Sequence, residues 1–239
     1  MDFDEFKDEL IIQAKKIDVI LDEEQIQKFY KYMELLLEWN EKINLTAIVE
    51  PHDIILKHFV DSLTVCKELE KNKTLADIGT GAGFPGIPVK ILRPDLDITL
   101  IDSLNKRVNF LTMVIETLKL EKIVALHGRI EDFGKNKKYR EKFDYVTSRA
   151  VANLSTLSEY MIPLAKIGGK CICMKGSNID EELKNAEKAI KTLGGKIEKV
   201  DTFLLPDTDM GRNIILIKKE KATPNKYPRK AGTPAKEPI

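Results

Sequence analysis

The fold is decided by one segment, Leu75–Gly86, which reads LADIGTGAGFPG. A short apolar run carrying the acid Asp77 breaks into four glycines and a proline within eight residues. Glycine has no Cβ and tolerates positive φ, so such a strand-to-turn switch lets the backbone approach a nucleotide-like ligand. A dinucleotide-binding loop has the spacing G-x-G-x-x-G, whereas Gly83 comes one residue early and Phe84 takes the expected place. A tight strand-to-helix turn without a ligand is the alternative.

The G-x-G-x-G spacing resembles the S-adenosylmethionine (SAM) loop of Rossmann-like methyltransferases. Helical patterns separate the first five of seven predicted strands, and another helix, 180–193, precedes the sixth. The last two strands leave no room for a helix and are joined by residues 206–211, which predicts an antiparallel pair. We therefore expect an α/β fold with parallel strands and a closing antiparallel hairpin, as in SAM-dependent methyltransferases. The predicted strands are Thr74–Ile78, Asp97–Asp102, Ile123–His127, Phe143–Ser148, Gly169–Lys175, Lys196–Leu205 and Arg212–Lys219.

The chain is predicted to have three parts: an N-terminal helical extension (1–73), the Rossmann-like core (74–220) and a basic C-terminal tail (221–239). Apolar residues at helical spacing predict helices in the extension. These are a first helix around Phe6–Ala14, a second from the N-cap Asp22 to near Asn40, and a third over Ile54–Leu69.

Two aromatic residues outside the core are interpreted separately. We expect Trp39, the only tryptophan, to be a packing residue, with a base-stacking platform as the alternative. The tail holds four of the ten prolines and is predicted to form no regular element. Tyr227 nevertheless suggests a defined strap over the domain.

Composition limits the classes of protein. Of the 239 residues, 43% are hydrophobic, and no apolar run approaches the ~20 residues that a membrane span needs. The acidic N-terminus lacks the features of a signal peptide, so we expect a cytoplasmic protein without membrane contact. Cys171 and Cys173 alternate along one predicted strand and are expected in the core. Three scattered histidines and no C-x-x-C spacing predict no metal site, and the absence of an apolar seam predicts a monomer.

The net charge of +1 hides an asymmetry between the two ends. Residues 1–40 contain 11 acids and 5 Lys or Arg, whereas residues 218–239 contain 7 Lys or Arg and 2 acids. A basic end can bind phosphates, and a merely solvated tail is the alternative.

Polar residues at the carboxyl ends of the predicted strands are candidates for ligand contact. Asp102 follows Gly83 by 19 residues, close to the offset at which an acid binds ribose hydroxyls. The alternative for Asp102 is the N-cap of the next helix, a role for which Ser103 and Asn105 compete. In the loop 127–132, the backbone and a carboxylate are placed to read an adenine edge and Ile130 to pack on its face. Arg149 follows the fourth strand, beside the expected donor methyl or in a structural salt bridge.

Common catalytic motifs are absent from the sequence. It contains no nucleophile elbow, no H-E-x-x-H and no P-loop lysine. Methyl transfer from a sulfonium needs little from side chains because the donor is already activated. An acceptor lone pair without a proton needs no general base, and positioning alone can supply roughly 7–11 kcal/mol. No catalytic residue is therefore assigned, and Arg149 is the nearest candidate.

Several motifs together resemble the RsmG (GidB) family of bacterial small-subunit ribosomal RNA methyltransferases. The resemblance runs from about residue 39 to the C-terminus. The motifs are LADIGTGAGFPG, His58–Leu63 (HFVDSL), Asp102-Ser103 with Lys106-Arg107, Ser148–Ala152 (SRAVA) and Lys226–Pro234 (KYPRKAGTP). The resemblance implies SAM-dependent methylation of the N7 of one guanine in 16S ribosomal RNA. That guanine lies in the decoding-region loop whose loss of methylation is linked to streptomycin resistance.

The resemblance also implies site residues. SAM contacts are expected at Gly79, Phe84, Ile130, Glu131 and Arg149. Candidates for RNA contact are Lys106 and Arg107 near the pocket rim and, in the tail, Lys226, Arg229, Lys230 and Lys236.

Other interpretations remain open at this point. His58, part of the HFVDSL motif, is alternatively a core histidine that is hydrogen-bonded to backbone. A methyltransferase for small molecules and a noncatalytic ribosome-assembly factor remain as other functions. A nicotinamide oxidoreductase is disfavoured by the glycine spacing and the terminal hairpin.

Overall fold

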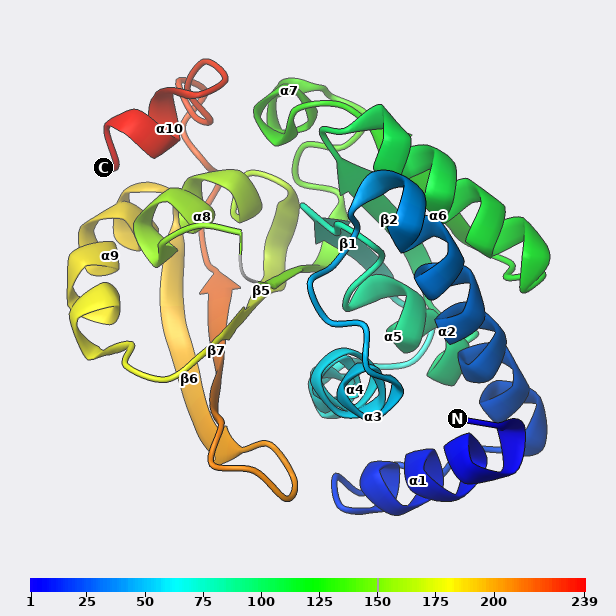
Figure 1. Ribbon diagram of the computed structural model, residues 1–239. Coiled ribbons are helices and arrows are strands. Elements are labelled where there is room, and N and C mark those ends of the chain that lie inside the picture. The colour runs from blue at the N-terminus through cyan, green and yellow to red at the C-terminus, as the bar shows by residue number, and fades with distance from the viewer. Residues whose placement is uncertain (150) are drawn as a thin grey trace.

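A computed structural model describes residues 1–149 and 151–239; Ala150, part of the SRAVA motif, lies outside the described residues. Seven strands form one sheet in the order β3-β2-β1-β4-β5-β7-β6 (Figure 1). Strands β1 to β5 pair in parallel, and β7 is antiparallel to both β5 and β6. The predicted α/β fold with a closing antiparallel hairpin is therefore confirmed. The strands are β1 Thr74–Ile78, β2 Asp97–Asp102, β3 Ile123–His127, β4 Phe143–Arg149, β5 Ala165–Lys175, β6 Gly195–Leu204 and β7 Gly211–Lys219.

The helices form two groups around this sheet. Figure 1 shows the N-terminal helices together with α5 and α6, whereas α8 and α9 lie together on the other side. Alternate residues of the strands enter different clusters: Leu75 packs with the first group and Ala76 with the second. Cys171 and Cys173 are buried in the second cluster, which confirms their placement in the core. The helices of the core are α5 Gly86–Leu92, α6 Asn105–Thr117, α7 Ile130–Lys135, α8 Leu154–Met161 and α9 Asp180–Thr192.

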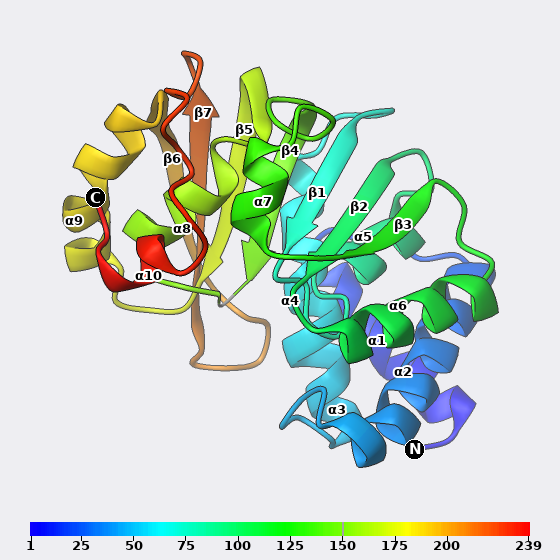
Figure 2. The same cartoon turned by 90° about the horizontal axis from the view of Figure 1, so that it is seen from above.

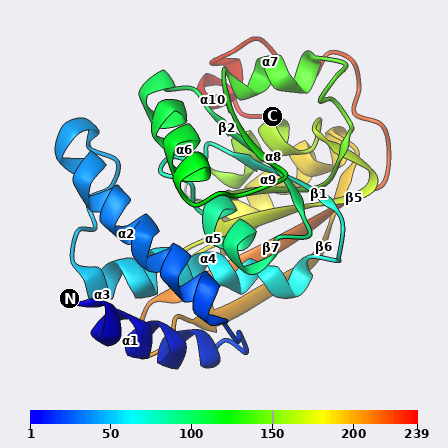
Figure 3. The ribbon, with the colours of Figure 1, turned by 90° about the vertical axis from the view of Figure 1, so that its right-hand side faces the viewer.

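The N-terminal extension forms the predicted helices with longer bounds. Helix α1 spans Phe3–Lys15 and α2 spans Glu23–Ile43, three residues beyond the predicted end. Asp22 is the N-cap of α2, as predicted: its side chain accepts a hydrogen bond from the Gln25 N–H, and the Gln25 side chain accepts one from Asp22. Figure 3 shows α2 running beside α5, with α1 packed below it. The ring centre of Trp39 lies 5.6 Å from that of Phe110, so Trp39 packs against the core and is a packing residue, as expected.

The third predicted helix, 54–69, is a composite. Helix α3 (Pro51–Asp53) leads into a π-helical segment (Ile54–Val60), then α4 (Asp61–Leu63) and a 3₁₀ segment (Thr64–Glu68). A π-helical turn inside a helix is frequent at functional sites, because the wider turn changes the direction of the side chains around it.

The prediction that the tail forms no regular element is wrong. Helix α10 covers Thr233–Lys236, and the chain before it is fixed by side chains of the core. Proline at the second position of α10 fits a first helical turn, where its missing N–H costs nothing. In the part of the chain that is described, no helix is long and apolar enough to cross a membrane.

Candidate functional site

The loop after β1 has the backbone conformation that its glycines predict. Gly79, Gly81 and Gly83 have φ values of +62°, +62° and +105°. This left-handed region costs most other residues free energy, so the three glycines let the chain turn sharply from β1 toward α5. The loop therefore presents backbone rather than side chains at the carboxyl edge of the sheet.

Asp77 fixes the conformation of this loop through hydrogen bonds. Its Oδ2 accepts hydrogen bonds from Thr80 Oγ1 at 2.6 Å and from the Gly86 N–H at 2.8 Å. The carboxyl is fully buried, Oδ1 has no partner among the described residues, and burial raises its pKa to about 7. Asp77 does not line the neighbouring cavity, so its role is to fix the loop.

A cavity of about 290 Å³ opens where β1, β2, the start of α7 and the tail meet. It brings together four of the predicted SAM-binding residues: Gly79, Asp102, Ile130 and Glu131. The sequence did not predict the contribution of the tail. The cavity is lined by Ile78, Gly79, Ile101, Asp102, Ser103, Gly128, Arg129, Ile130, Glu131, Val151, Ala152, Tyr160, Gly232 and Ala235.

Asp102 connects the glycine loop to the end of β2. Its Oδ2 accepts a hydrogen bond from the Gly81 N–H at 2.9 Å, and its Oδ1 accepts one from the Leu104 N–H at 2.9 Å. Arg107 Nη1 lies 3.5 Å from Oδ2. The N-cap of α6 is Leu104, so the alternative that made Asp102 the N-cap is wrong. Each carboxylate oxygen keeps a lone pair for a further donor.

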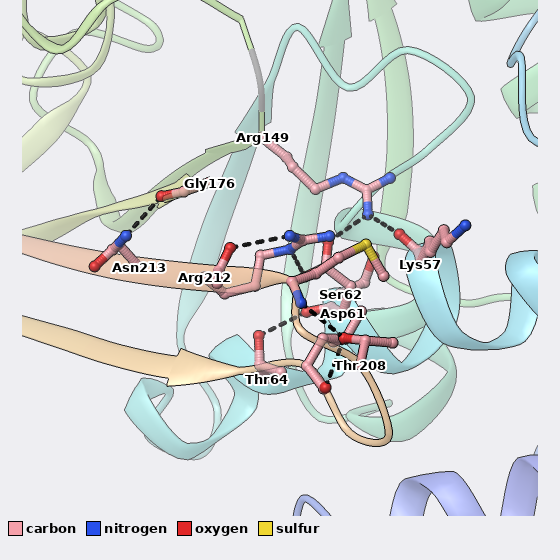
Figure 4. A network of polar contacts seen from close by, with 12 residues as sticks. Lys57, Asp61, Ser62, Thr64, Arg149, Gly176, Thr208, Arg212 and Asn213 are labelled. Atoms are coloured by element: carbon pink, nitrogen blue, oxygen red, sulfur yellow. Dashed lines mark hydrogen bonds and ion pairs between the residues drawn. The ribbon is translucent and has the colours of Figure 1, made fainter. Parts of the chain in front are cut away.

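Phe84 and Arg149 are not among the residues that line this cavity. Arg149 belongs to a polar cluster (Figure 4), and its guanidinium lies over the Phe84 ring. Arg149 Nη1 donates to the Lys57 carbonyl and to Asp61 Oδ2, both at 2.9 Å. Its Nη2 donates to His58 Nδ1 at 3.0 Å, and the guanidinium lies 4.9 Å from the centre of the Phe84 ring. The salt bridge that sequence reasoning kept as the alternative for Arg149 is present.

Asp61 is the centre of this cluster, and sequence reasoning gave it no role. Its second oxygen, Oδ1, accepts a hydrogen bond at 2.9 Å from Nε of Arg212, which lies on β7 (Figure 4). Two guanidiniums thus neutralise a carboxylate that is only 3% exposed. The one sequence signal was the position of Asp61 inside the HFVDSL motif; Arg212, 151 residues away, carried none.

His58 is neutral in this environment. Burial, reinforced by the positive charge of Arg149, lowers its pKa to about 3. Because Nδ1 accepts from Arg149, Nε2 carries the proton and donates to Thr46 Oγ1 at 2.8 Å. The ring stacks on Phe84 with 4.3 Å between the ring centres. His58 is buried, as its alternative stated, but its ring nitrogens bond to the side chains of Thr46 and Arg149 and not to backbone as that alternative expected.

The predicted RNA-binding residues occupy different surroundings. Lys106 and Arg107 lie in the first turn of α6, and Lys230 is an exposed tail residue. The Nζ of Lys226 lies 5.1 Å from the centre of the Tyr227 ring.

Arg229 is engaged differently from the prediction. Its Nε lies 3.0 Å from Glu159 Oε1 and its Nη2 lies 2.7 Å from Glu159 Oε2, and this carboxylate is 1% exposed. Arg229, a candidate for RNA contact, is thus paired with a buried carboxylate of the core. Among the described residues, no group of three His, Cys, Asp or Glu side chains is placed to hold a metal ion.

The sheet order, with β7 antiparallel between β5 and β6, and the glycine loop after β1 define the class as Rossmann-like SAM-dependent methyltransferases. A solved SAM-dependent methyltransferase from Aquifex aeolicus shares this fold, with a TM-score of 0.51 and 19% identity over 70% of this chain and 93% of its own. The sequence comparison is more specific. The chain belongs to the rRNA small subunit methyltransferase G (GidB) family, whose profile matches residues 25–210.

Relatives in this family match over almost their whole length. The ribosomal RNA small subunit methyltransferase G of Desulforamulus reducens is 57% identical over 228 residues, covering 95% of each chain. The protein of the same name from Acetivibrio thermocellus is 53% identical over 231 residues, covering 96% of this chain and 95% of its own. The predicted family is thereby confirmed.

Proposed function

We propose that this chain transfers a methyl group from SAM to the N7 of a guanine in 16S ribosomal RNA. The observation that carries the proposal is the cavity at the carboxyl edge of the sheet. There a left-handed glycine loop, the carboxylate of Asp102 and the Ile130-Glu131 pair converge from three different elements. Membership in the small-subunit rRNA methyltransferase G family supplies the class of substrate.

The residues present fit the donor. Asp102 has accepting capacity for ribose hydroxyls, and its neighbours Gly79 and Gly81 leave room for the backbone to approach a ligand. Ile130 offers an apolar face to the adenine, and Glu131 a carboxylate near its edge. When bound, SAM supplies a methyl group already activated on a sulfonium. Phe84 and Arg149 act from the adjacent cluster, where they order the far end of the loop.

The chain has no need of a general base for this reaction, because guanine N7 bears a lone pair and no proton. His58, which stacks on Phe84 next to the loop, is neutral, and both of its ring nitrogens are already hydrogen-bonded. Catalysis then rests on holding the acceptor in line with the donor, which can contribute roughly 7–11 kcal/mol. Asp102 and Glu131 are the carboxylates of the cavity that favour the cationic purine of the product.

RNA binding needs phosphate contacts around the cavity. Lys106 and Arg107 lie beside Asp102, and Lys226 and Lys230 lie on the tail that borders the same cavity. We assign phosphate contacts to these four residues and the methylated base to a splayed conformation. Because one chain lines the whole cavity, we also propose that it acts as a monomer.

The experiment is methyl transfer from isotopically labelled SAM to purified 30S subunits, followed by nucleoside digestion and mass spectrometry. The expected product is labelled 7-methylguanosine in 16S RNA. Label in another nucleoside would reject the N7 assignment. Label in a small molecule alone would support the alternative substrate class, and no transfer at all would support the noncatalytic assembly factor.

A further inference from the structure

The C-terminal tail follows a defined path across the core. Figure 2 shows it leaving β7 and passing α7 and α8 before it reaches α10 and then the C-terminus. Arg140 fixes the first part of this path: its guanidinium donates to the carbonyls of Thr223 and Tyr227, both at 2.7 Å. The Thr156 hydroxyl on α8 donates to the carbonyl of Pro234 at 3.0 Å, which fixes the last part.

The strongest anchor is the pair of Arg229 and Glu159. Glu159 Oε1 also accepts the backbone N–H of Arg229 at 2.7 Å, so the tail supplies both a guanidinium and an amide to one carboxylate. Burying a carboxylate is costly unless it is paired and hydrogen-bonded. The guanidinium and the backbone amide of the tail compensate the charge of Glu159, which is 1% exposed with the tail in place, so α8 and the tail are matched at this point.

Helix α7 carries a second adaptation to the tail. A Cβ on Gly134 would lie 2.7 Å from Cγ of Pro228, closer than real Cβ contacts allow. The backbone of Gly134 is helical, so its glycine is needed for this contact and not for a special φ. The same helix begins with Ile130 and Glu131, which line the cavity. The position of Pro228 is thus tied to a helix that forms one side of the donor site.

The tail also reaches the cavity directly. The Gly232 N–H donates to Glu131 Oε1 at 2.8 Å, and Gly232 and Ala235 line the cavity together with Tyr160 of α8. Glu131 is 4% exposed, so this bond helps to fix the orientation of its carboxylate. The tail therefore holds in place Glu131, a residue that the proposed function assigns to contact with SAM.

We propose that residues 223–239 form a wall of the donor site, and that closure of this wall and SAM binding stabilise one another. The proposal rests on the proposed function, because it concerns the same cavity. It adds Gly232 and Ala235 as donor-site residues and Arg229 and Glu159 as positioning residues. Coupling of this kind is reciprocal: whatever opens the tail weakens SAM binding, and SAM protects the tail from opening.

Hydrogen exchange on the intact chain tests the second half of this relation. With saturating SAM, exchange should slow at the amides of the loop 79–83 and also at 229–236, while α1, which lies at the opposite end of the molecule from α10 (Figure 1), serves as an internal control. Slowing at the loop alone would overturn the proposal and leave the proposed function standing. Slowing at neither segment would reject SAM binding in this cavity, and with it the proposed function.

Calorimetry on variants tests the first half. Arg229→Ala should raise the Kd for SAM about tenfold, a coupling within the usual range. Gly134→Ala keeps every anchoring charge and should raise the Kd in the same direction by displacing Pro228. Lys221→Ala removes the same charge as Arg229→Ala from an exposed position and should leave the Kd unchanged. If Arg229→Ala does not fold, Gly134→Ala decides; an unchanged Kd in the folded variants would overturn the proposal.

Discussion

The donor cavity and the Asp61 cluster lie at the same edge of the sheet but are built in opposite ways. The cavity is formed by backbone in the left-handed region and by a carboxylate, Asp102, whose two hydrogen bonds leave accepting capacity. In the cluster, Asp61 is shared by Arg149 and Arg212, and the ring nitrogens of His58 are both bonded. The cavity keeps hydrogen-bond acceptors free for a ligand. In the Asp61 cluster the polar groups bond to one another, so the cluster serves as a frame that supports the site.

The largest effect should come from breaking the frame. Asp61→Ala removes the carboxylate that both guanidiniums face. It should lower the free energy of unfolding by about 2–3 kcal/mol. This is less than a fully buried ion pair would cost, because both arginines are partly exposed. Urea unfolding measures it. Asp53→Ala breaks the partly exposed Asp53–Lys57 pair in the same helical stretch and should cost less than about 0.5 kcal/mol. Equal losses in the two variants would contradict the central role of Asp61.

Substitutions in the cavity should change the affinity for SAM. Asp102→Ala removes an acceptor for the ribose and should raise the Kd for SAM about 10- to 100-fold, the range of a hydrogen bond to a charged group. Asp97→Ala lies at the exposed start of the same strand and should leave the Kd unchanged. Isothermal titration calorimetry compares the two, and an unchanged Kd in Asp102→Ala would remove Asp102 from the donor site.

His58 makes the frame sensitive to pH. Its pKa is about 3 in the folded chain and about 6.5 when unfolded, so only the unfolded chain takes up the proton between these values. The stability that His58 contributes is therefore present above pH 6.5 and lost as the pH falls, by about 2 kcal/mol at pH 5. Unfolding measured from pH 8 to pH 5 should show this loss in the wild type and less of it in His58→Gln. Parallel curves would contradict a neutral His58.

The smallest effect is expected at the rim. Lys226→Ala and Lys230→Ala should each lower the slope of log Kd against log salt for RNA binding by about 0.7, one phosphate contact on single-stranded RNA. Lys188→Ala removes an exposed charge on α9, away from the cavity, and serves as the control. Slopes that match the control would exclude the tail lysines from the RNA-binding surface.

The cavity could be predicted from sequence because its signals are local. The glycine spacing from Gly79 to Gly83, and the offset of Asp102, depend on residues that are neighbours in the chain or on adjacent parallel strands. The Asp61 cluster depends on contacts such as that with Arg212, which no local pattern marks. The charge of Arg229 makes it a candidate for RNA contact, but no local pattern indicates its pairing with Glu159, which lies 70 residues away. Charge alone cannot tell a solvated arginine from a paired one.

The tail was predicted only in part: the strap over the domain that Tyr227 suggests agrees with its anchoring by Arg140, whereas helix α10 was not predicted. Its prolines and its lack of large apolar residues indicated a segment without regular structure. The tail is held instead by hydrogen bonds to its carbonyls, chiefly from Arg140, and composition carries no information on such bonds.

A crystal structure of the chain with S-adenosylhomocysteine, the product of the donor, tests the central claim most directly. We expect the adenosine in the cavity, with the ribose hydroxyls within hydrogen-bond distance of Asp102 and the adenine beside Ile130 and Glu131. Density for the ligand anywhere else, or a ribose turned away from Asp102, would contradict it.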